Sequence, residues 1–217
     1  MFGEASADGH DALLIHELYD AIMDWDERDR LGMEPVMSVL DDIEALSDID
    51  EVTGFISDPD RCNCVDAFVC FAVEADINDP TRYIVTVDTD TPILEDAEEY
   101  YNFTDLGNRA YEGKKELYLT LAGKLGMDEA VAEERFNSVL SLEEQIAQVK
   151  LTRTQRLKPG VYELVNNVFT NEEVRGRKGD FPLYDVLRGY GLGTSDRYNI
   201  MEPKVLKRLD ELYTEDN

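Results

Sequence analysis

The stretch LYLTLAGKLGMDEAVAEERFNSVLSLEEQIA, residues 117–147, carries two helical patterns that meet at one short turn. Leucines recur every four residues in the first pattern, and this spacing places them on one face of a helix: Leu117, Leu121 and Leu125. The pattern predicts a helix from about Leu106 to Leu125, ended by Gly126, because glycine adopts the left-handed conformation that closes helices. Asp128 then suits the N-cap of a second helix.

The second helix of this stretch is expected from residue 129 to about residue 151 and has an apolar stripe with one charged member. The stripe consists of Val131, Arg135, Val139, Leu142, Ile146 and Val149. Two helices joined by so short a turn pack antiparallel, so the stretch predicts a helical hairpin. A hairpin of this length favours a mainly α fold.

Further helical patterns precede and follow the hairpin. We expect helices over residues 11–30, 35–46 and 48–56 before it, and over 181–192 and 202–213 after it. Thr170 and Glu173 have the spacing of a capping box, which predicts one more short helix. Residues 1–10 are expected to form a disordered leader, which leaves residues 11–217 as one helical domain.

A change of period interrupts the helical patterns near residues 65–90. VDAFVCFAVEAD at 65–76 and TRYIVTVDTD at 81–90 are rich in β-branched and aromatic residues, and Asn78-Asp79-Pro80 lies between them. This arrangement predicts a β-hairpin. The expected fold class is therefore mainly α, a multi-helix lobe with one small β-hairpin.

The charge balance of the chain limits its partners. Of 217 residues, 48 are acidic and 21 are basic, which gives a formal net charge of −27. So negative a chain repels phosphates, which argues against nucleic acid and anionic membranes as partners. No apolar run approaches the roughly 20 residues that span a bilayer, and the N-terminus lacks the basic start of a signal peptide. The sequence does not indicate a cellular location.

One segment near the N-terminus comes close to a zinc-hydrolase motif. HELYD, residues 16–20, has Asp20 where H-E-x-x-H requires a second histidine. The other histidine of the chain, His10, lies in the leader. His16 falls about 200° around the helix from Leu14, away from the apolar stripe that Leu14 begins. We interpret His16 and Asp20 as an exposed i, i+4 pair rather than as metal ligands.

Other candidate sites are also incomplete. Cys62, Cys64 and Cys70 lack a fourth ligand nearby, so buried or free thiols are expected rather than a metal site. The glycines of GYGLGT follow a predicted helix, whereas a phosphate loop precedes one. Neither histidine has the G-x-S-x-G partner of a serine hydrolase, and carboxylates are too abundant to single out an acid–base pair. The residues alone therefore indicate no catalytic residue, no cofactor-binding residue and no metal ligand.

Taken in order, several stretches resemble the neprilysin family of zinc metallopeptidases, which includes bacterial oligopeptidases of the PepO type. The first stretch, residues 16–46, matches through Tyr19, Asp26, Arg28, Gly32 and Pro35. The later matches are the turn Asp76–Asp79, the paired Tyr100–Tyr101, the hairpin stretch 117–147, the segment Asn167–Thr170 and the final segment 199–213. The chain departs from the family in having ILEDAEEYY without a Leu-Pro before the tyrosines. It also has Val165-Asn166 in place of an aromatic residue.

The resemblance covers residues 11–217 and implies a role for this segment. In this family the zinc motif, a further glutamate ligand and an assisting acid residue lie in a C-terminal catalytic lobe, which this chain does not contain. The resemblance implies the non-catalytic helical portion of a zinc metalloendopeptidase, part of a chamber that limits substrates to peptides. Zinc is expected in the missing lobe, and that lobe and peptide substrates are the expected partners. The alternative is a stand-alone acidic helical module that binds a basic protein or peptide.

Overall fold

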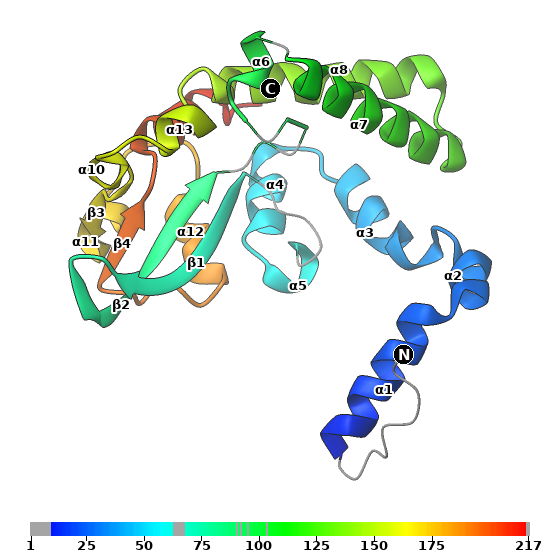
Figure 1. The fold of residues 1–217 in the computed structure, drawn as a ribbon, viewed down its shortest axis with the longest axis horizontal. Helices are drawn as coiled ribbons and strands as arrows, with labels where there is room; N and C mark the ends of the chain where they lie inside the picture. The colour runs from blue at the N-terminus through cyan, green and yellow to red at the C-terminus, as the bar shows by residue number, and fades with distance from the viewer. Residues whose placement is uncertain are drawn as a thin grey trace. The chain divides into compact units, whose positions relative to one another are not determined.

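The computed structural model describes residues 10–62, 68–89, 91, 93–94, 96–102 and 104–215. The chain divides into two compact units, Met1–Ala45 and Leu46–Asn217. The first unit contains the helices α1 His10–Met23, α2 Trp25–Leu31 and α3 Glu34–Glu44. The second unit contains the remaining helices and all the described strands (Figure 1).

The first unit has two helices where the sequence predicts one over residues 11–30. The helix is interrupted at Asp24, whose ψ of 80° lies outside the helical region. The Asp24 carboxylate accepts a hydrogen bond from the backbone N–H of Glu27 at 3.0 Å, so Asp24 is the N-cap of α2. The predicted end at Gly32 is confirmed, with a φ of +55°. The prediction of one continuous helix is wrong because the aspartate cap begins a new helix.

The second unit is mainly helical with a small sheet, as predicted. In chain order it contains α4 Ile49–Ile56, α5 Pro59–Cys62, β1 Val69–Asp76, β2 Asp79–Thr89, α6 Glu99–Asn102, α7 Asp105–Lys124, α8 Glu129–Ala147, α9 Arg153–Arg156, α10 Val161–Val165, β3 Val168–Thr170, α11 Asn171–Arg175, α12 Leu183–Gly189, β4 Arg197–Ile200 and α13 Pro203–Leu212. The helices expected over 35–46, 48–56, 181–192 and 202–213 correspond to α3, α4, α12 and α13.

None of the helices in the described part of the chain is long and apolar enough to cross a membrane.

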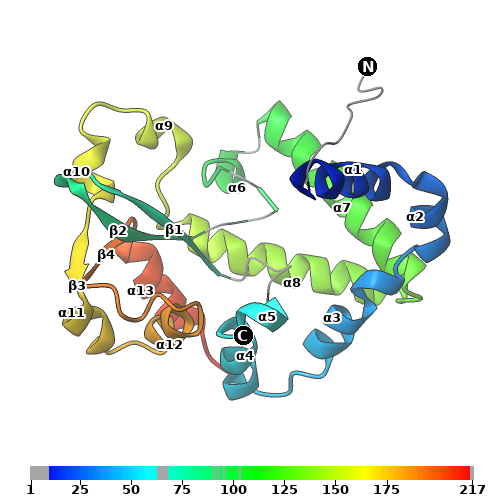
Figure 2. The ribbon, with the colours of Figure 1, turned by 90° about the horizontal axis from the view of Figure 1, so that it is seen from below.

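The predicted helical hairpin is confirmed, because α7 and α8 pack side by side (Figure 1) and meet at the short turn that joins them (Figure 2). Gly126, with a φ of +80°, closes α7. The N–H of Met127 donates back to the carbonyl of Ala122 at 3.0 Å, which completes the helix end. Asp128 then caps α8 by accepting from the N–H of Ala130 at 3.0 Å. Gly126 and Asp128 therefore have the roles that the sequence predicts for them, as the end of α7 and the N-cap of α8.

The buried face of α8 differs from the predicted stripe in the first half of the helix. Val131 and Val139 are 43% and 47% exposed. The buried positions are Ala132, Phe136, Glu143, Ile146 and Ala147. The ring centroid of Phe136 lies 5.8 Å from that of Tyr111 and 5.6 Å from that of Tyr118, so Phe136 faces α7. Packing against these two aromatic rings of α7 decides which face of α8 is buried.

The predicted β-hairpin is confirmed as β1 and β2, which pair antiparallel, with Val69 opposite Thr89 and Ala75 opposite Tyr83. It belongs to a larger sheet with the strand order β1-β2-β4-β3. In this sheet β4 is parallel to β2, and β3 is antiparallel to β4. The sequence does not predict β3 and β4, because runs of three and four residues are too short to show a strand period.

The core of the second unit lies between the sheet and the C-terminal helices. Its buried side chains include Val85, Val87, Tyr198 and Ile200 from the sheet, Leu187 from α12, and Val205 and Leu209 from α13. The predicted capping box is confirmed at the start of α11, where Thr170 and Glu173 bond each other's backbone N–H groups. The sheet therefore brings residues from both sides of the helical hairpin into one core.

Candidate functional site

A cavity of about 800 Å³ lies beside the base of the β1–β2 hairpin, next to α7 and α9. Four of its lining residues are basic, in a chain with a net charge of −27: Lys114, Lys150, Arg153 and Arg156. Apolar lining comes from residues that include Ile93, Leu94 and Leu106, and carboxylates come from Asp88, Asp96 and Glu99. The cavity therefore combines apolar contact with charged groups of both signs, four basic and three acidic.

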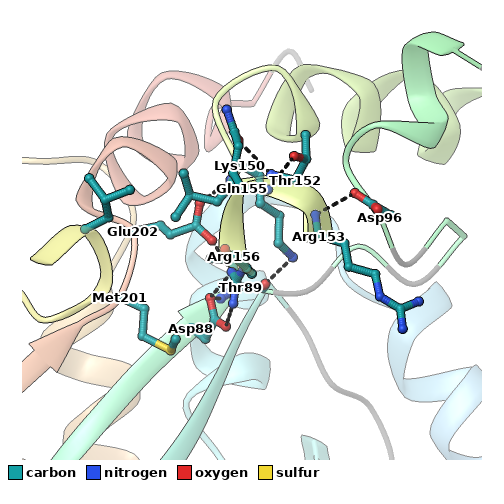
Figure 3. Close-up of polar contacts among 12 residues, drawn as sticks. Asp88, Thr89, Asp96, Lys150, Thr152, Arg153, Gln155, Arg156, Met201 and Glu202 are labelled. Atoms are coloured by element: carbon teal, nitrogen blue, oxygen red, sulfur yellow. Dashed lines mark hydrogen bonds and ion pairs between the residues drawn. The ribbon is translucent and has the colours of Figure 1, made fainter. Parts of the chain in front are cut away.

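Arg156 is held at the cavity by two carboxylates from other parts of the chain (Figure 3). Its guanidinium lies 3.3 Å and 3.4 Å from the two oxygens of Asp88 in β2 and also bonds Oε1 of Glu202, just before α13. Oε2 of Glu202 accepts from the N–H of Leu151 at 2.5 Å. Burial raises the pKa of Glu202, although the Leu151 hydrogen bond and the charge of Arg156 oppose the rise. Arg156 therefore joins β2, α9 and the start of α13.

The short helix α9 directs Arg153 differently. A capping box between Thr152 and Gln155 begins the helix. The N–H of Arg153 donates to Oδ1 of Asp96 at 3.0 Å, which attaches α9 to the loop before α6. The guanidinium of Arg153 points away from the Arg156 cluster (Figure 3), and it has no ion-pair partner among the described residues. Arg153 is therefore the lining cation best placed to meet a ligand.

The paired tyrosines Tyr100 and Tyr101 attach the cavity wall to α8. The hydroxyl of Tyr100 donates to the buried carboxylate of Glu143 and accepts from the N–H of Leu94 at 2.9 Å. The same carboxylate accepts from the N–H of Ile93 at 3.0 Å. Burial, together with the hydrogen bond to Glu143 and its charge, raises the pKa of Tyr100. Tyr101 donates to the last carbonyl of α8, so both tyrosines hold the wall in place.

The near-motif HELYD forms the exposed pair that the sequence predicts. Nδ1 of His16 lies 2.9 Å from Oδ2 of Asp20, and the two side chains are 64% and 62% exposed. The side chain of His10 lies outside the described part of the structure. No three His, Cys, Asp or Glu side chains among the described residues gather to hold a metal. His16 and Asp20 supply fewer donors than the three protein ligands typical of catalytic zinc, so the described residues do not fit that site.

The cysteines and glycines singled out in the sequence lie in different surroundings. Cys62 is buried, whereas Cys70 is exposed on β1 and lines the cavity. Cys64 falls outside the described residues, so its thiol state stays a prediction. The helix α12 ends at Gly189, and Gly191 follows with a φ of +73°, which is the arrangement expected of a glycine-rich helix exit.

Sequence reasoning did not identify the cluster around Arg156. Its carboxylate partners, Asp88 and Glu202, lie 68 and 46 residues away along the chain. No motif links residues so far apart, because the sheet and α13 bring them together only in the folded chain. One local signal was present, since Thr152 and Gln155 have the spacing of a capping box.

A sequence model of peptidase family M13 matches residues 3–217. The chain belongs to peptidase family M13. The resemblance to neprilysin-like and PepO-type peptidases is thereby confirmed, and this M13 chain is the N-terminal region of a family member. Comparison with curated protein sequences gives no match.

Solved structures of relatives share the fold of this M13 chain. The zinc metalloprotease ZMP1 of Mycobacterium tuberculosis in its open state aligns with a TM-score of 0.78 at 18% identity, over 98% of this chain and 32% of ZMP1. ZMP1 in complex with an inhibitor aligns with a TM-score of 0.76 at 19% identity, over 99% of this chain and 32% of ZMP1. PepO from Lactobacillus rhamnosis HN001 gives 0.68 at 17% identity, over 86% of this chain and 29% of PepO. This M13 chain spans about a third of the length of these proteins.

Proposed function

We propose that this chain is the non-catalytic helical portion of a zinc metalloendopeptidase and forms part of a chamber that limits substrates to peptides. The observation that carries the proposal is membership of family M13 over residues 3–217. On this proposal zinc lies in a catalytic lobe of the same polypeptide, where it supplies an activated water for peptide hydrolysis.

The size and lining of the cavity suit a segment of peptide. Its volume of about 800 Å³ lies within the range of small-ligand pockets and is far too small for a folded domain. Ile93 and Leu94 offer apolar contact, and Arg153 offers a guanidinium that can bind a carboxylate with two parallel hydrogen bonds. A wall of this kind lowers the entropic part of a reaction barrier by holding an extended peptide near the reacting groups.

The polar contacts around the cavity support a positioning role. Arg156 bonds Asp88 and Glu202, and Lys150 donates to the carbonyl of Thr89 at 2.5 Å. These groups bond one another and thereby fix the shape of the wall. They are the contacts expected of a rigid surface against which a substrate lies.

The proposed partners are the catalytic lobe and peptide substrates, with no nucleic acid and no membrane contact from this segment. The net charge of −27 supports the exclusion of polyanions. The same charge favours the alternative, a stand-alone acidic helical module that binds a basic protein or peptide. The two functions differ in their response to salt, because ion-driven binding weakens as ionic strength rises, whereas association through apolar surface does not.

The test uses the purified chain alone and together with the catalytic lobe encoded by the same gene. We expect the chain alone to bind no stoichiometric zinc and to leave a fluorogenic peptide intact. Mixed with the lobe, it should form a complex that cleaves the peptide and spares a folded protein of the same local sequence. Stoichiometric zinc and peptide cleavage by the chain alone would refute the proposal. Salt-sensitive binding of oligolysine, without any effect on the lobe, would favour the alternative.

A further inference from the structure

The strand β1 lies at an edge of the sheet. The strand order β1-β2-β4-β3 places β2 on one side of β1 and no described strand on the other. From Cys70, which lines the cavity, β1 runs out along the hairpin to Asp76. An edge strand has one row of backbone N–H and C=O groups without a ladder partner, and such a row can pair with another extended chain.

The register of the sheet shows which residues of β1 direct these groups outward. The carbonyl of Val87 accepts from the N–H of Met201 at 3.0 Å, so the peptide groups of Val87 face β4 rather than β1. Phe71 lies opposite Val87, and this is therefore a pair without mutual hydrogen bonds. It follows that Phe71 directs its own N–H and C=O away from β2. The same alternation applies to Val73 and Ala75.

The outer half of β1 is open and carries apolar side chains. Val73 is 60% exposed, and Ile77 and Tyr83 in the outer part of the hairpin are 53% and 78% exposed. Val73 and Ala75 share one face of the hairpin with Tyr83, which lies opposite Ala75. Natural edge strands are commonly protected by proline or lysine, and β1 contains neither.

We propose that the outer edge of β1 binds an extended peptide as an added strand, over the backbone groups of Phe71, Val73 and Ala75. Alternate apolar side chains of the peptide would lie beside Val73 and Ala75, on the face of the hairpin that also carries Tyr83. The opposite face of β1 carries the exposed carboxylate of Glu74, so a lysine or arginine of the peptide is favoured there. The inference rests on the proposed function, because it identifies a surface for the peptides that the chamber admits.

Charge favours a basic peptide over a second copy of the chain. Two β1 edges could pair with each other, but each copy would bring Glu74 to the shared ribbon and a net charge of −27 to the complex. Like charges across strands are destabilising. A basic peptide would instead be attracted both to Glu74 and to the net negative charge of the chain.

The experiment measures binding of a fluorescent, end-blocked peptide of alternating valine and lysine to the full 217-residue chain by anisotropy. Two further probes have the same sequence but carry N-methyl groups on one or the other alternate set of peptide nitrogens. Strand addition uses one set of N–H groups in a given register, so the two methylated probes should differ in affinity. One should bind about tenfold or more weakly, because methylation of the paired set removes several interchain hydrogen bonds at once.

The protein variant Val73→Pro tests the same edge from the other side. Its missing N–H is one that points outward, so the β1–β2 ladder is retained while strand addition is blocked. Val73→Thr is the matched control, because it keeps the N–H and a β-branched side chain. We expect peptide binding to be lost in Val73→Pro and kept in Val73→Thr. In wild type, added peptide should slow hydrogen exchange at Phe71, Val73 and Ala75, but leave Ala72 and Glu74 unchanged.

Three results would overturn the inference. These are equal binding of both methylated probes, unchanged binding by a folded Val73→Pro variant, and a Val73-dependent dimer in sedimentation that peptide does not dissociate. Failure here is distinguishable from failure of the proposed function. If the chain binds no peptide at β1 but still forms an active peptidase with the catalytic lobe, the proposed function stands and the β1 site is wrong.

Discussion

The hydroxyl of Tyr100 in α6 donates to the buried carboxylate of Glu143 in α8, and this contact joins α6 to the helical hairpin. Tyr100→Phe removes the hydroxyl with little change of shape and leaves the carboxylate with one donor fewer. We expect a loss of about 1–3 kcal/mol in the free energy of unfolding, the typical cost of an unsatisfied buried polar group. Urea unfolding followed by circular dichroism measures it.

The control for this variant is Tyr83→Phe, at a side chain that is 78% exposed. Its unfolding free energy should change little. The exposed hydroxyl contacts water in both the folded and the unfolded state, so its removal affects both states about equally. Equal losses of unfolding free energy in the two variants would mean that the contact with Glu143 makes no contribution of its own to stability.

Glu202 predicts a dependence of stability on pH. Burial raises its pKa in the folded state, against the opposing effects of Leu151 and Arg156. Because the folded pKa exceeds the unfolded one, the folded state holds the proton more tightly. The contribution to stability is full below the unfolded pKa and falls as pH rises through the folded pKa. We expect the difference in unfolding free energy between wild type and Glu202→Gln to decrease as pH rises above about 4.3.

Calorimetric or urea unfolding at several pH values tests this slope. Glu116→Gln, on the exposed face of α7, is the control for loss of a carboxylate elsewhere, and its difference from wild type should vary less with pH. A flat profile for Glu202→Gln would show that burial of this carboxylate has no energetic consequence.

Removal of the capping box at the start of α11 should lower the stability of the protein. Thr170→Ala removes the hydroxyl that accepts from the N–H of Glu173 at 3.2 Å. We expect unfolding to become easier by about 1 kcal/mol, as for other lost N-caps. Thr120→Ala, at an exposed position inside α7, should be neutral or slightly stabilising because alanine is the better helix former. An unfolding free energy of Thr170→Ala equal to that of wild type would contradict the capping role.

The buried face of α8 predicts opposite outcomes at adjacent residues. Ala132 is 1% exposed, so Ala132→Leu forces a larger side chain into packed space and should cost about 1–3 kcal/mol. Val131, which is 43% exposed, should tolerate leucine with little change in thermal midpoint. If Val131→Leu were the more damaging variant, the stripe predicted from the sequence would be the true buried face.

Arg153 predicts a selective effect on substrates of the proposed peptidase. In the full enzyme, Arg153→Ala should raise KM for an acidic peptide by about fivefold, the worth of roughly 1 kcal/mol from an exposed ion pair. The kcat should stay unchanged, because the lost contact stabilises the bound substrate and the transition state equally. Arg109→Ala, on α7 and not among the residues that line the cavity, is the matched control. An equal KM change for a neutral peptide would argue against a charge contact at Arg153.

Local signals in the sequence predicted much of the helical part of this fold. Gly126 ends α7, Asp128 caps α8, and Thr170 and Glu173 form their capping box, because each role depends on residues within one turn of the helix. The break at Asp24 was missed although it is also local, since aspartate is tolerated inside a helix as well as at its cap.

The sequence by itself determined the helical hairpin, the β-hairpin and their caps, because short-range periodicity and turn chemistry decide them. Only the tertiary structure decided the pairing of β2 with β4, the buried face of α8 and the meeting of Asp88, Arg156 and Glu202. The physical reason is that these features depend on contacts between residues far apart in the chain. Such contacts follow from packing and burial of the whole unit, which no local spacing records.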